Sequence, residues 1–417
     1  MSGPRDAAPR DVARPVVAPD DAPGRLAGRS AIVAGAGLAG LAAAWQLRTW
    51  GCEVRVLEAR ERIGGRVWTV RNGFVEGQHA EAGADLIDEG QTTIRDFARR
   101  FGLVTVRILR DGFASYRLDD AGTRTVRRGV RGWDELYRRL ADDVRAFRAA
   151  DCDWTSPVAA KIGQRSIAHW LDDEGAGPAL RSMATSLRGF FAADPDDLSL
   201  LVLVDQLAHD DPPGLFRIAN GNDTLAAALA RGIDVALGHV VRAVRDDGAR
   251  VTVRCSDLDG RSAEASADAV VLALPAPLLR AVVIEPAPPD RQAEAIARLR
   301  HGPATKASLQ FAQRFWRAHG RPSAVGSDMP HGAVWDANEQ QAGEAGILTL
   351  LAGGGASDAL SRRLAGDGID ALRRDLAWLG ADESSVVGLH VARWGEDPWS
   401  RGAYAAFDAG FAPALRP

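Results

Sequence analysis

Sulfur-containing side chains and tyrosine are scarce in this sequence. Its 417 residues include three cysteines, three methionines and three tyrosines. Cys52, Cys152 and Cys255 are odd in number, lie far apart and lack C-x-x-C spacing, so neither a disulfide framework nor a zinc site is expected. The eight histidines show no metal-ligand spacing either, and we predict no metal site. The lack of a disulfide pattern favours a reducing, cytoplasmic location.

Long apolar runs and an excess of positive charge are also absent. No stretch approaches the roughly 18 apolar residues of a membrane span. The opening residues are rich in Ala, Pro, Asp and Arg and lack the apolar core of a signal peptide, so we predict a disordered tail over residues 1–28. With 51 basic and 55 acidic residues the net charge is −4, and no nucleic-acid or membrane partner is expected.

Lysine is nearly missing from the basic residues. Of the 51, only Lys161 and Lys306 are lysines, so the position of each is informative. The hydrophobic fraction of 46% and the charged fraction of 25% are otherwise typical of a globular protein. The length corresponds to two or three domains of roughly 150 residues.

A strand, a helix and a second strand follow the predicted tail. Residues 30–34 form a short apolar run that ends at Gly35, and residues 38–50 carry Ala, Leu and Trp at helical spacing. Gly51 ends this helix, and residues 52–58 alternate as a strand. The pattern predicts a βαβ unit.

The rest of the chain divides into a helical part and a mixed part. Residues 93–214 mostly lack strand alternation, which predicts a helical insertion. Its expected helices cover 93–101, 133–149, 166–173, 178–191 and 198–209. Beyond it we expect strands at 269–274, 307–311, 347–352 and 386–393, helices at 225–231, 291–299 and 367–379, and a hairpin over 240–255. No long linker separates these segments, so the domains are predicted to be interleaved.

The turn after the first strand carries a dinucleotide-binding motif. Gly35, Gly37 and Gly40 fit G-x-G-x-x-G between a strand and a helix. Gly35 permits a tight turn, Gly37 lets the backbone approach a pyrophosphate, and Gly40 lets the helix pack on the strand. The helix N-terminus, with Leu38 and Ala39, offers N–H groups to the anion.

A carboxylate and a segment rich in Gly and Arg follow the second strand. Glu58 stands at the end of that strand, where a carboxylate can bind the hydroxyl of an adenosine ribose. Residues 58–67 read E-A-R-E-R-I-G-G-R-V. Such a segment can direct backbone N–H groups and guanidinium groups along a diphosphate. The glycine motif alone leaves NAD, NADP and FAD open.

At residues 58–67 the sequence resembles the flavin-containing amine oxidase family, which includes monoamine, polyamine and L-amino-acid oxidases. The resemblance extends from residue 29 to about residue 416 through later segments in the family's order. These segments are 81–88 (E-A-G-A-D-L-I-D), 220–225 (N-G-N-D-T-L), Val241, 272–275 (L-A-L-P), Trp394 and 399–404 (W-S-R-G-A-Y).

The resemblance implies an α/β fold in which a Rossmann-type FAD-binding domain is interleaved with a substrate domain made of a mixed sheet and a helical insertion. The implied FAD-binding domain comprises 29–92 and 215–280, the insertion 93–214, and the substrate-domain sheet with its return towards the FAD domain 281–417. The residues implied to bind FAD are Gly35, Gly37, Leu38, Ala39, Gly40, Glu58, Ala59, Arg60, Gly64, Gly65, Arg66, Gly83, Ala84, Asp85, Leu86, Val241 and Trp394. Ala403 stands where monoamine oxidases carry the cysteine that bonds the flavin, so non-covalent FAD is expected.

Lys306 and Tyr404 are the implied catalytic residues. Lys306 follows H-G-P-A-T and resembles the family lysine that holds a water next to flavin N5. Lysine, unlike arginine, is compact and can lose its proton when buried, which suits that task. Tyr404 resembles the tyrosine that forms one side of the aromatic cage in amine oxidases.

Two departures from the family pattern bear on the substrate and on the end of the chain. L-Amino-acid oxidases carry a Met-Arg pair at the positions of Asp85 and Leu86, and that arginine can clamp the substrate carboxylate. Its absence favours an amine or an unusual amino acid, although Arg188 or Arg217 could substitute. The family also continues past Pro417 with a strand, a loop and a helix. We therefore expect processing, truncation or loss of function, and either a companion C-terminal polypeptide or a homodimer.

The expected function is FAD-dependent oxidation of a C–N bond. Hydride transfer from an amine or amino acid to flavin N5 would give an imine, and O₂ is the expected acceptor, giving H₂O₂. Two alternatives stay open. One is a flavin-dependent C–C desaturase of the carotenoid or porphyrinogen type, and the other is a non-catalytic or incomplete fragment that needs the companion segment.

Overall fold

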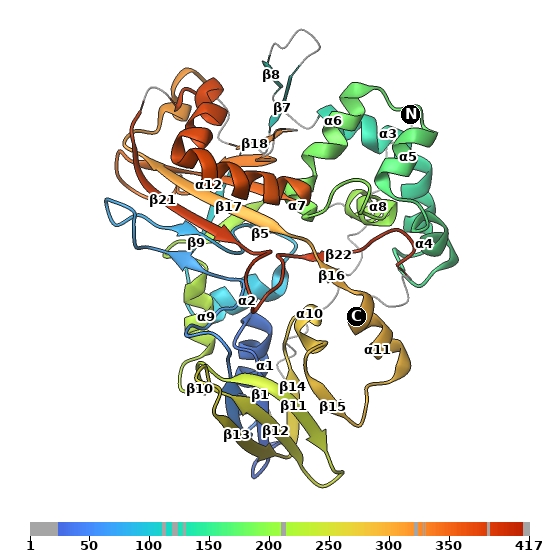
Figure 1. Cartoon of the computed structure of the whole chain (residues 1–417), viewed down its shortest axis with the longest axis vertical. Helices are drawn as coiled ribbons and strands as arrows, with labels where there is room; N and C mark the ends of the chain where they lie inside the picture. The colour runs from blue at the N-terminus through green and yellow to red at the C-terminus, as the bar shows by residue number, and fades with distance from the viewer. Residues whose placement is uncertain are drawn as a thin grey trace, which may run out of the picture.

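The computed structural model describes residues 24–110, 114–118, 124–127, 131–209, 214–320, 324–327, 329, 331–381 and 384–411. Figure 1 shows a parallel sheet at the bottom, a larger sheet at the upper left and a group of helices at the upper right. Most of the predicted tail, residues 1–23, lies outside the described residues. Residues 24–28 form turns instead, and the Leu26 N–H donates to the Trp50 carbonyl at 2.8 Å.

The lower sheet is the predicted βαβ unit extended by two strands. Its strand order is β10-β2-β1-β14, and all neighbours are parallel. The strands are β1 (Ser30–Ala34), β2 (Glu53–Leu57), β10 (Asp234–Ala236) and β14 (Ala269–Leu272). Helix α1 (Leu38–Thr49) packs on β1, whose apolar residues are buried as expected for a covered parallel strand. The predicted α/β class and this unit are confirmed.

A second, mostly antiparallel sheet of order β13-β12-β11-β15 lies beside it. The predicted hairpin is β11 (Val240–Asp246) and β12 (Val251–Ser256), followed by β13 (Ser262–Ala267) and β15 (Val283–Glu285). The Asp247 carboxylate accepts from two backbone N–H groups of the turn, which explains why the turn forms here. Strand β15 pairs with β11, so this sheet reaches past residue 280, the boundary expected from the sequence. The nearby helices are α9 (Asp223–Leu229), α10 (Ala276–Leu279) and α11 (Asp290–Arg298).

The upper-left sheet has seven strands in the order β21-β17-β20-β19-β18-β7-β8. They are β7 (Ala114–Leu118), β8 (Arg124–Arg127), β17 (Ala304–Phe311), β18 (Ala324–Ser327), β19 (Ala333–Asp336), β20 (Gly346–Gly353) and β21 (Val386–Arg393). Strands β17 and β20 are buried along their whole length. Helix α12 (Gly355–Leu376) covers them and bends at Gly368, with η1 (Phe315–Gly320) and η2 (Ala377–Leu379) nearby. The predicted helix at 367–379 covered only the second half of α12.

The upper-right group of helices has its own apolar core. Its helices are α3 (Arg131–Ala149), α4 (Pro157–Ile162), α5 (Ile167–Asp173), α6 (Pro178–Ser186), α7 (Arg188–Phe191) and α8 (Leu200–Ala208). Helix α2 (Thr92–Arg100) packs instead near α1. The predicted helical insertion also contains strands β6 (Thr105–Ile108), β7 and β8. β7 pairs with β8 and with β18, and the pairing with β18, more than 200 residues away, could not be found from local periodicity.

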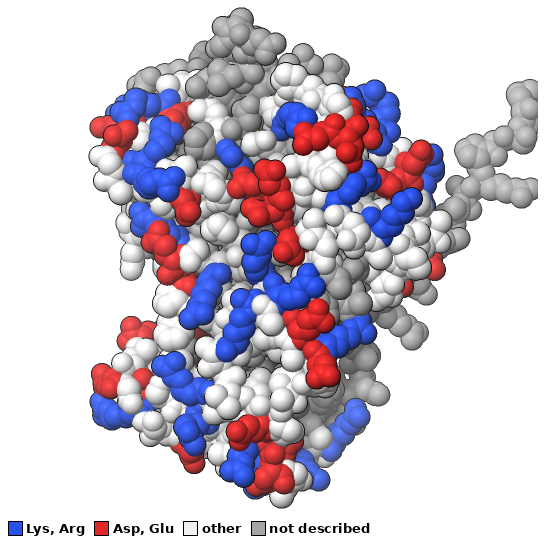
Figure 2. Space-filling model, turned by 45° about the vertical axis from the view of Figure 1, so that its right-hand side comes forward, with Lys and Arg blue, Asp and Glu red and all other residues white. Residues whose placement is uncertain are grey.

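The remaining short strands form three small sheets. One small sheet has the order β5-β9-β6, and two others pair β3 with β4 and β16 with β22. Their bounds are β3 (Thr69–Val70), β4 (Ala80–Glu81), β5 (Ile87–Asp88), β9 (Leu215–Ile218), β16 (Arg300–His301) and β22 (Ala405–Ala406). Figure 2 shows acidic and basic side chains interspersed over one face of the molecule. Among the described residues no helix combines the length and the apolar character needed to cross a membrane.

Candidate active site

The glycine turn between β1 and α1 has the geometry that its motif predicts. Gly35 has φ +103°, and a Cβ there would lie 2.7 Å from the Ala273 carbonyl oxygen. A Cβ on Gly40 would lie 1.9 Å from the Gly35 oxygen, so only glycine lets α1 pack this closely on the strand. A Cβ on Gly37 would meet nothing within 4 Å. Gly37 therefore faces open space, where a diphosphate could come close to the protein backbone.

Glu58 fastens the end of β2 to this turn. Its carboxylate accepts from the Ala36 N–H at 2.7 Å and from the Arg60 N–H at 2.8 Å. The side chain is only 6% exposed, and the exposed part lies in a cleft. Because an ionised carboxylate can accept about four hydrogen bonds, lone pairs remain for a ligand.

The cleft over the glycine turn has a volume of about 400 Å³. It is lined by residues predicted to bind FAD and by a second set of residues, all of which except Val67 come from later parts of the chain. The residues from the first set are Gly35, Gly37, Leu38, Ala39, Glu58, Ala59, Arg60, Gly64, Gly65 and Arg66. The second set is Val67, Ala273, Leu274, Pro275, Leu278, Trp399 and Ser400. The sequence segments 58–67, 272–275 and 399–404 are thus brought together.

The three arginines of the segment 58–67 have different partners. The Arg60 guanidinium makes two hydrogen bonds of 2.7 Å to Asp397 and a third to the Ser400 hydroxyl. Arg62 donates to two backbone carbonyls and lies 4.7 Å from the centre of the Trp68 ring. Arg60 and Arg62 therefore have partners within the protein, while Arg60 and Arg66 line the cleft. Arg60 also ties the 397–400 loop to the cleft, because its fork matches a carboxylate.

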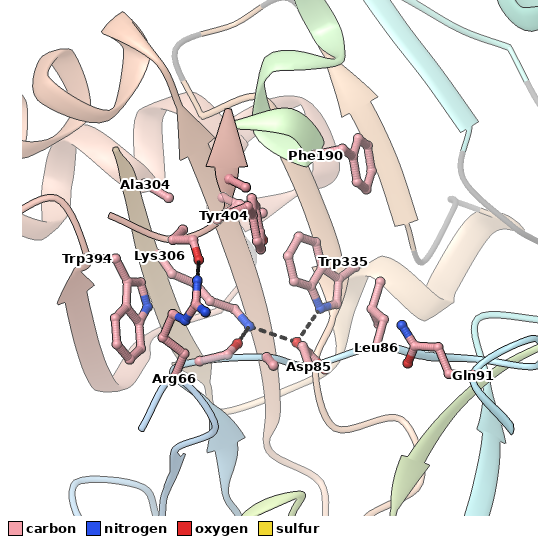
Figure 3. A pocket seen from close by; sticks show the side chains of 15 residues that line it. Arg66, Asp85, Leu86, Gln91, Phe190, Ala304, Lys306, Trp335, Trp394 and Tyr404 are labelled. Atoms are coloured by element: carbon pink, nitrogen blue, oxygen red, sulfur yellow. Dashed lines mark hydrogen bonds and ion pairs between the residues drawn. The ribbon is translucent and has the colours of Figure 1, made fainter. Parts of the chain in front are cut away.

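Arg66 lies between the cleft and a second cavity of about 510 Å³, and it lines both. Its guanidinium donates to the Ala403 carbonyl at 2.6 Å, and burial lowers its pKa. The second cavity is mostly apolar, and Figure 3 shows the side chains that line it. Its lining residues are Arg66, Gly83, Ala84, Asp85, Leu86, Gln91, Phe190, Ala304, Lys306, Trp335, Leu351, Trp394, Ala403, Tyr404 and Ala405.

A cluster of buried charges forms one side of this cavity. Lys306 on β17 donates to the Gly83 carbonyl and to the Asp85 carboxylate, both at 3.0 Å. The same carboxylate accepts from the Trp335 indole at 2.9 Å and from Arg217. All four side chains are at most 5% exposed. The contacts between Lys306, Asp85 and Trp335 are drawn in Figure 3.

The cluster shifts the ionisation of its members. Burial alone would raise the pKa of Asp85, but Arg217 and Lys306 outweigh burial, and the pKa is lowered. Burial lowers the pKa of Lys306, against the attraction of Asp85. Glu81, which is buried nearby and accepts from Thr69 and the Asn222 N–H, has its pKa raised to about 7 by burial and by Asp85. The cluster therefore favours the ionised form of Asp85 beside Arg217 and Lys306.

Aromatic side chains form the other sides of the cavity. Tyr404 is 42% exposed and Phe190 is 37% exposed, and both line the cavity with Trp335. Trp394 is buried and donates to the Ala82 carbonyl at 2.9 Å, which holds its ring against the 82–84 backbone. Although Tyr404 as a whole is 42% exposed, its phenol is desolvated, which raises its pKa to about 12, so the phenol stays protonated at neutral pH.

Some predicted site residues lie away from both cavities. Gly40 allows α1 to pack closely on β1. Val241 lies on β11, is buried in an apolar core and lines neither cavity. Neither Arg188 nor Arg217, the two candidates for a carboxylate clamp, lines the cavity. Arg217 is 1% exposed and is bonded to Asp85. Within the described ranges, no three His, Cys, Asp or Glu side chains are grouped as metal ligands.

Sequence reasoning missed several cavity residues. Phe190, Trp335 and Leu351 carry no motif, and they reach the cavity only because β19, β20 and α7 fold beside the loop 82–86. Asp397, the partner of Arg60, was likewise not predicted. A weak signal existed for Asp397, because it lies two residues before the W-S-R-G-A-Y segment that the resemblance includes.

Comparison with known proteins agrees with this geometry. The family model "Flavin containing amine oxidoreductase" matches residues 38–413. Polyamine oxidase 4 from Oryza sativa subsp. japonica is 28% identical over 395 residues, which are 90% of this chain and 78% of that protein. Putrescine oxidase from Kocuria rosea is 28% identical over 92% of this chain and 85% of that protein. The solved structure of wild-type putrescine oxidase bound to putrescine has a TM-score of 0.78 and 26% identity, covering 92% of this chain and 89% of that chain.

Proposed function

Because this chain belongs to the flavin-containing amine oxidase family, to which it matches over residues 38–413, we propose that it oxidises apolar monoamines. Its activity is FAD-dependent oxidation of an amine C–N bond. The desaturase and the non-catalytic alternatives are not favoured, since the matched relatives are named as oxidases of amines or amino acids. The proposal concerns which amine is used, and it is supported mainly by the charges that line the larger cavity.

The residues present fit FAD. Gly37 leaves open space at the N-terminus of α1, and the Glu58 carboxylate keeps lone pairs in the cleft, so the diphosphate and the adenosine ribose would lie there. Arg66 connects the cleft with the larger cavity, which would hold the ring system and the substrate. A bound flavin accepts two electrons from the C–H next to the amine nitrogen and passes them to O₂.

The chain's own residues orient the amine and limit water. Trp335, Tyr404 and Phe190 offer aromatic faces to an apolar substrate and cover the cavity. Lys306 has three N–H donors, and two of them bind Gly83 and Asp85. The third is available to hold a water or a substrate atom in the cavity.

The charges of the cavity disfavour a second ionic group on the substrate. Among the described lining residues the only carboxylate is Asp85, which already accepts from Lys306, Arg217 and Trp335. The distal ammonium of a diamine would therefore find no unpaired anion. The only arginine among the described lining residues is Arg66, which is bonded to the Ala403 carbonyl, so a substrate carboxylate would lack an arginine clamp. Burying an unpaired charge is costly.

Three six-carbon compounds test the proposal. Hexylamine, 1,6-diaminohexane and L-norleucine each contain six carbons. The diamine adds a distal ammonium to hexylamine, and L-norleucine has one of its six carbons as a carboxylate on the carbon that bears the amine. We expect kcat/KM for peroxide release to be higher for hexylamine than for either of the others by at least about tenfold, the factor that 1.4 kcal/mol gives. Equal or higher values for the diamine or the amino acid would exclude an apolar monoamine as the preferred substrate.

A pair of variants at Leu86 refines this test. Leu86 lines the cavity at the position where L-amino-acid oxidases carry an arginine. Leu86→Arg should raise the ratio of L-norleucine to hexylamine turnover, because it supplies the missing cation. Leu86→Met, with a similar volume and no charge, should leave the ratio near that of the wild type. A cytoplasmic location and a companion polypeptide or homodimer stay predictions.

A further inference from the structure

One buried carboxylate connects four separate segments beside the larger cavity. Asp85 lies in the loop after β4, Arg217 on β9, Lys306 on β17 and Trp335 on β19. One Asp85 oxygen accepts from both Lys306 and Trp335, and the other accepts from Arg217. Asp85 and Lys306 line the cavity, whereas Arg217 lies behind them.

The arrangement restricts Lys306 in a way that its own strand does not. A lysine side chain has four rotatable bonds and ordinarily many rotamers, so a fixed ammonium requires fixed acceptors. The Gly83 carbonyl belongs to a backbone segment that Trp394 and Asn222 also hold by hydrogen bonds to neighbouring carbonyls. The Asp85 carboxylate is in turn held by Arg217 and Trp335. Both acceptors of Lys306 are therefore fixed before any ligand binds.

We propose that Asp85 is a positioning residue, which keeps the Lys306 amine directed at the cavity and opposes the loss of its proton, and that Arg217 and Trp335 fix its carboxylate for this purpose. The inference rests on the proposed function only in that Lys306 acts on the bound substrate or its water. Nothing in the resemblance assigned this role to Asp85, which was expected to contact FAD.

The charges around Lys306 support this role. The charged and titratable groups that act on its ammonium are Asp85, Glu81 and Arg217, and the Trp335 ring lies 5.2 Å from the nitrogen. Burial and Arg217 favour the neutral amine, while Asp85 and Glu81 favour the ammonium. Of these three charged groups only Asp85 is bonded to Lys306, so removal of Asp85 should make the amine both less often protonated and less restricted.

The scarcity of lysine makes the inference measurable. Acetic anhydride acylates neutral amines, and the chain has only Lys161, which is exposed, and Lys306. Brief labelling of the FAD-loaded protein at pH 8, followed by peptide mass spectrometry, gives the ratio of Lys306 to Lys161 acetylation. In Asp85→Asn this ratio should rise at least tenfold over the wild type. An unchanged ratio would overturn the proposal.

Two further variants protect the test from a folding defect. Asp85→Asn leaves Arg217 buried without its partner, whereas Asp85→Asn combined with Arg217→Met keeps the net charge of the cluster. The combined variant should still show a rise in the labelling ratio, smaller than that of Asp85→Asn alone because Arg217 favours the neutral amine, and no rise would also overturn the proposal. Asp336→Asn is the matched control. Asp336 is an equally buried carboxylate next to Trp335 that binds Trp316 and Arg317, so its loss should leave the ratio within twofold.

Kinetics give a second readout that a structural role alone would not move. If Asp85 acts through Lys306, the variant Asp85→Asn/Lys306→Met should be no slower in flavin reduction or reoxidation than Lys306→Met alone. Additive losses would contradict the inference. Labelling does not depend on turnover, so the two proposals can fail separately. If hexylamine is not the preferred substrate but the ratio of Lys306 to Lys161 labelling rises in Asp85→Asn, the substrate proposal is rejected and the role of Asp85 is kept.

Discussion

Replacing Glu58 by Gln tests how the chain holds the adenosine end of FAD. The Glu58 carboxylate accepts from the Ala36 and Arg60 N–H groups, which leaves about two of its four acceptor positions for the ribose hydroxyls. Glutamine has the same shape but one acceptor oxygen and no charge. It cannot accept from both backbone donors, so one N–H loses its partner whichever way the amide is turned.

The structure sets the size of both effects. A hydrogen bond to a charged group contributes about 1.5–3 kcal/mol, which corresponds to a roughly 10- to 150-fold rise in the Kd for FAD. An orphaned buried N–H costs about 1–3 kcal/mol of folding stability. We therefore expect Glu58→Gln to bind FAD at least about tenfold more weakly and to unfold at lower denaturant concentration even without FAD.

The assay is titration of FAD into the apoprotein, followed by the quenching of flavin fluorescence, with chemical unfolding of the same apoprotein in parallel. Glu53→Gln is the matched control, because Glu53 lies on the same strand β2 and is exposed. Its Kd and its stability should equal those of the wild type. A Kd for Glu58→Gln within twofold of the wild type would refute the assignment of Glu58.

Three further predictions follow from single residues. Gly37→Ala should fold with near wild-type stability, since its methyl group meets only open space, and fail to retain FAD because that space is where the diphosphate would lie. Gly40→Ala should lower apoprotein stability, because its Cβ collides with the Gly35 oxygen. Thermal melts and flavin content separate the two variants. The pKa of Glu81 is raised from 4.5 to about 7, so the protonated group stabilises the fold fully below pH 4.5. About 3 kcal/mol of unfolding free energy is lost as the pH rises through 7. Denaturant titrations of the Glu81→Gln apoprotein should lack this loss. Acid precipitation should release all flavin into the supernatant, since Ala403 offers no sulfur for a bond, and flavin left in the pellet would contradict non-covalent binding.

Local patterns predicted the cofactor end of the molecule well. The glycine turn, α1 and the position of Glu58 depend on residues within one βαβ unit, so spacing alone indicates how they meet. Lys306 could be predicted as a site residue because lysine is so rare in this chain and because its surroundings resemble a family segment. In both cases the chemical constraint is carried by neighbours in sequence.

The larger cavity was less predictable because its parts come from distant segments. Asp85 is 132 residues from Arg217, 221 from Lys306 and 250 from Trp335. No periodicity links these positions, and only the pairing of β17 and β19 with β20 brings Lys306 and Trp335 to one side of the cavity. The same limit hid the pairing of Arg60 with Asp397.

Anaerobic mixing of the FAD-loaded protein with hexylamine shows whether the larger cavity oxidises an apolar amine. We expect the flavin absorbance near ~450 nm to bleach at a rate that saturates as the hexylamine concentration rises. Admitting O₂ should restore the colour and give one H₂O₂ for each amine oxidised. L-Norleucine at the same concentration should bleach the flavin at least about tenfold more slowly. A flavin that stays oxidised with hexylamine would contradict the claim that this cavity oxidises apolar amines.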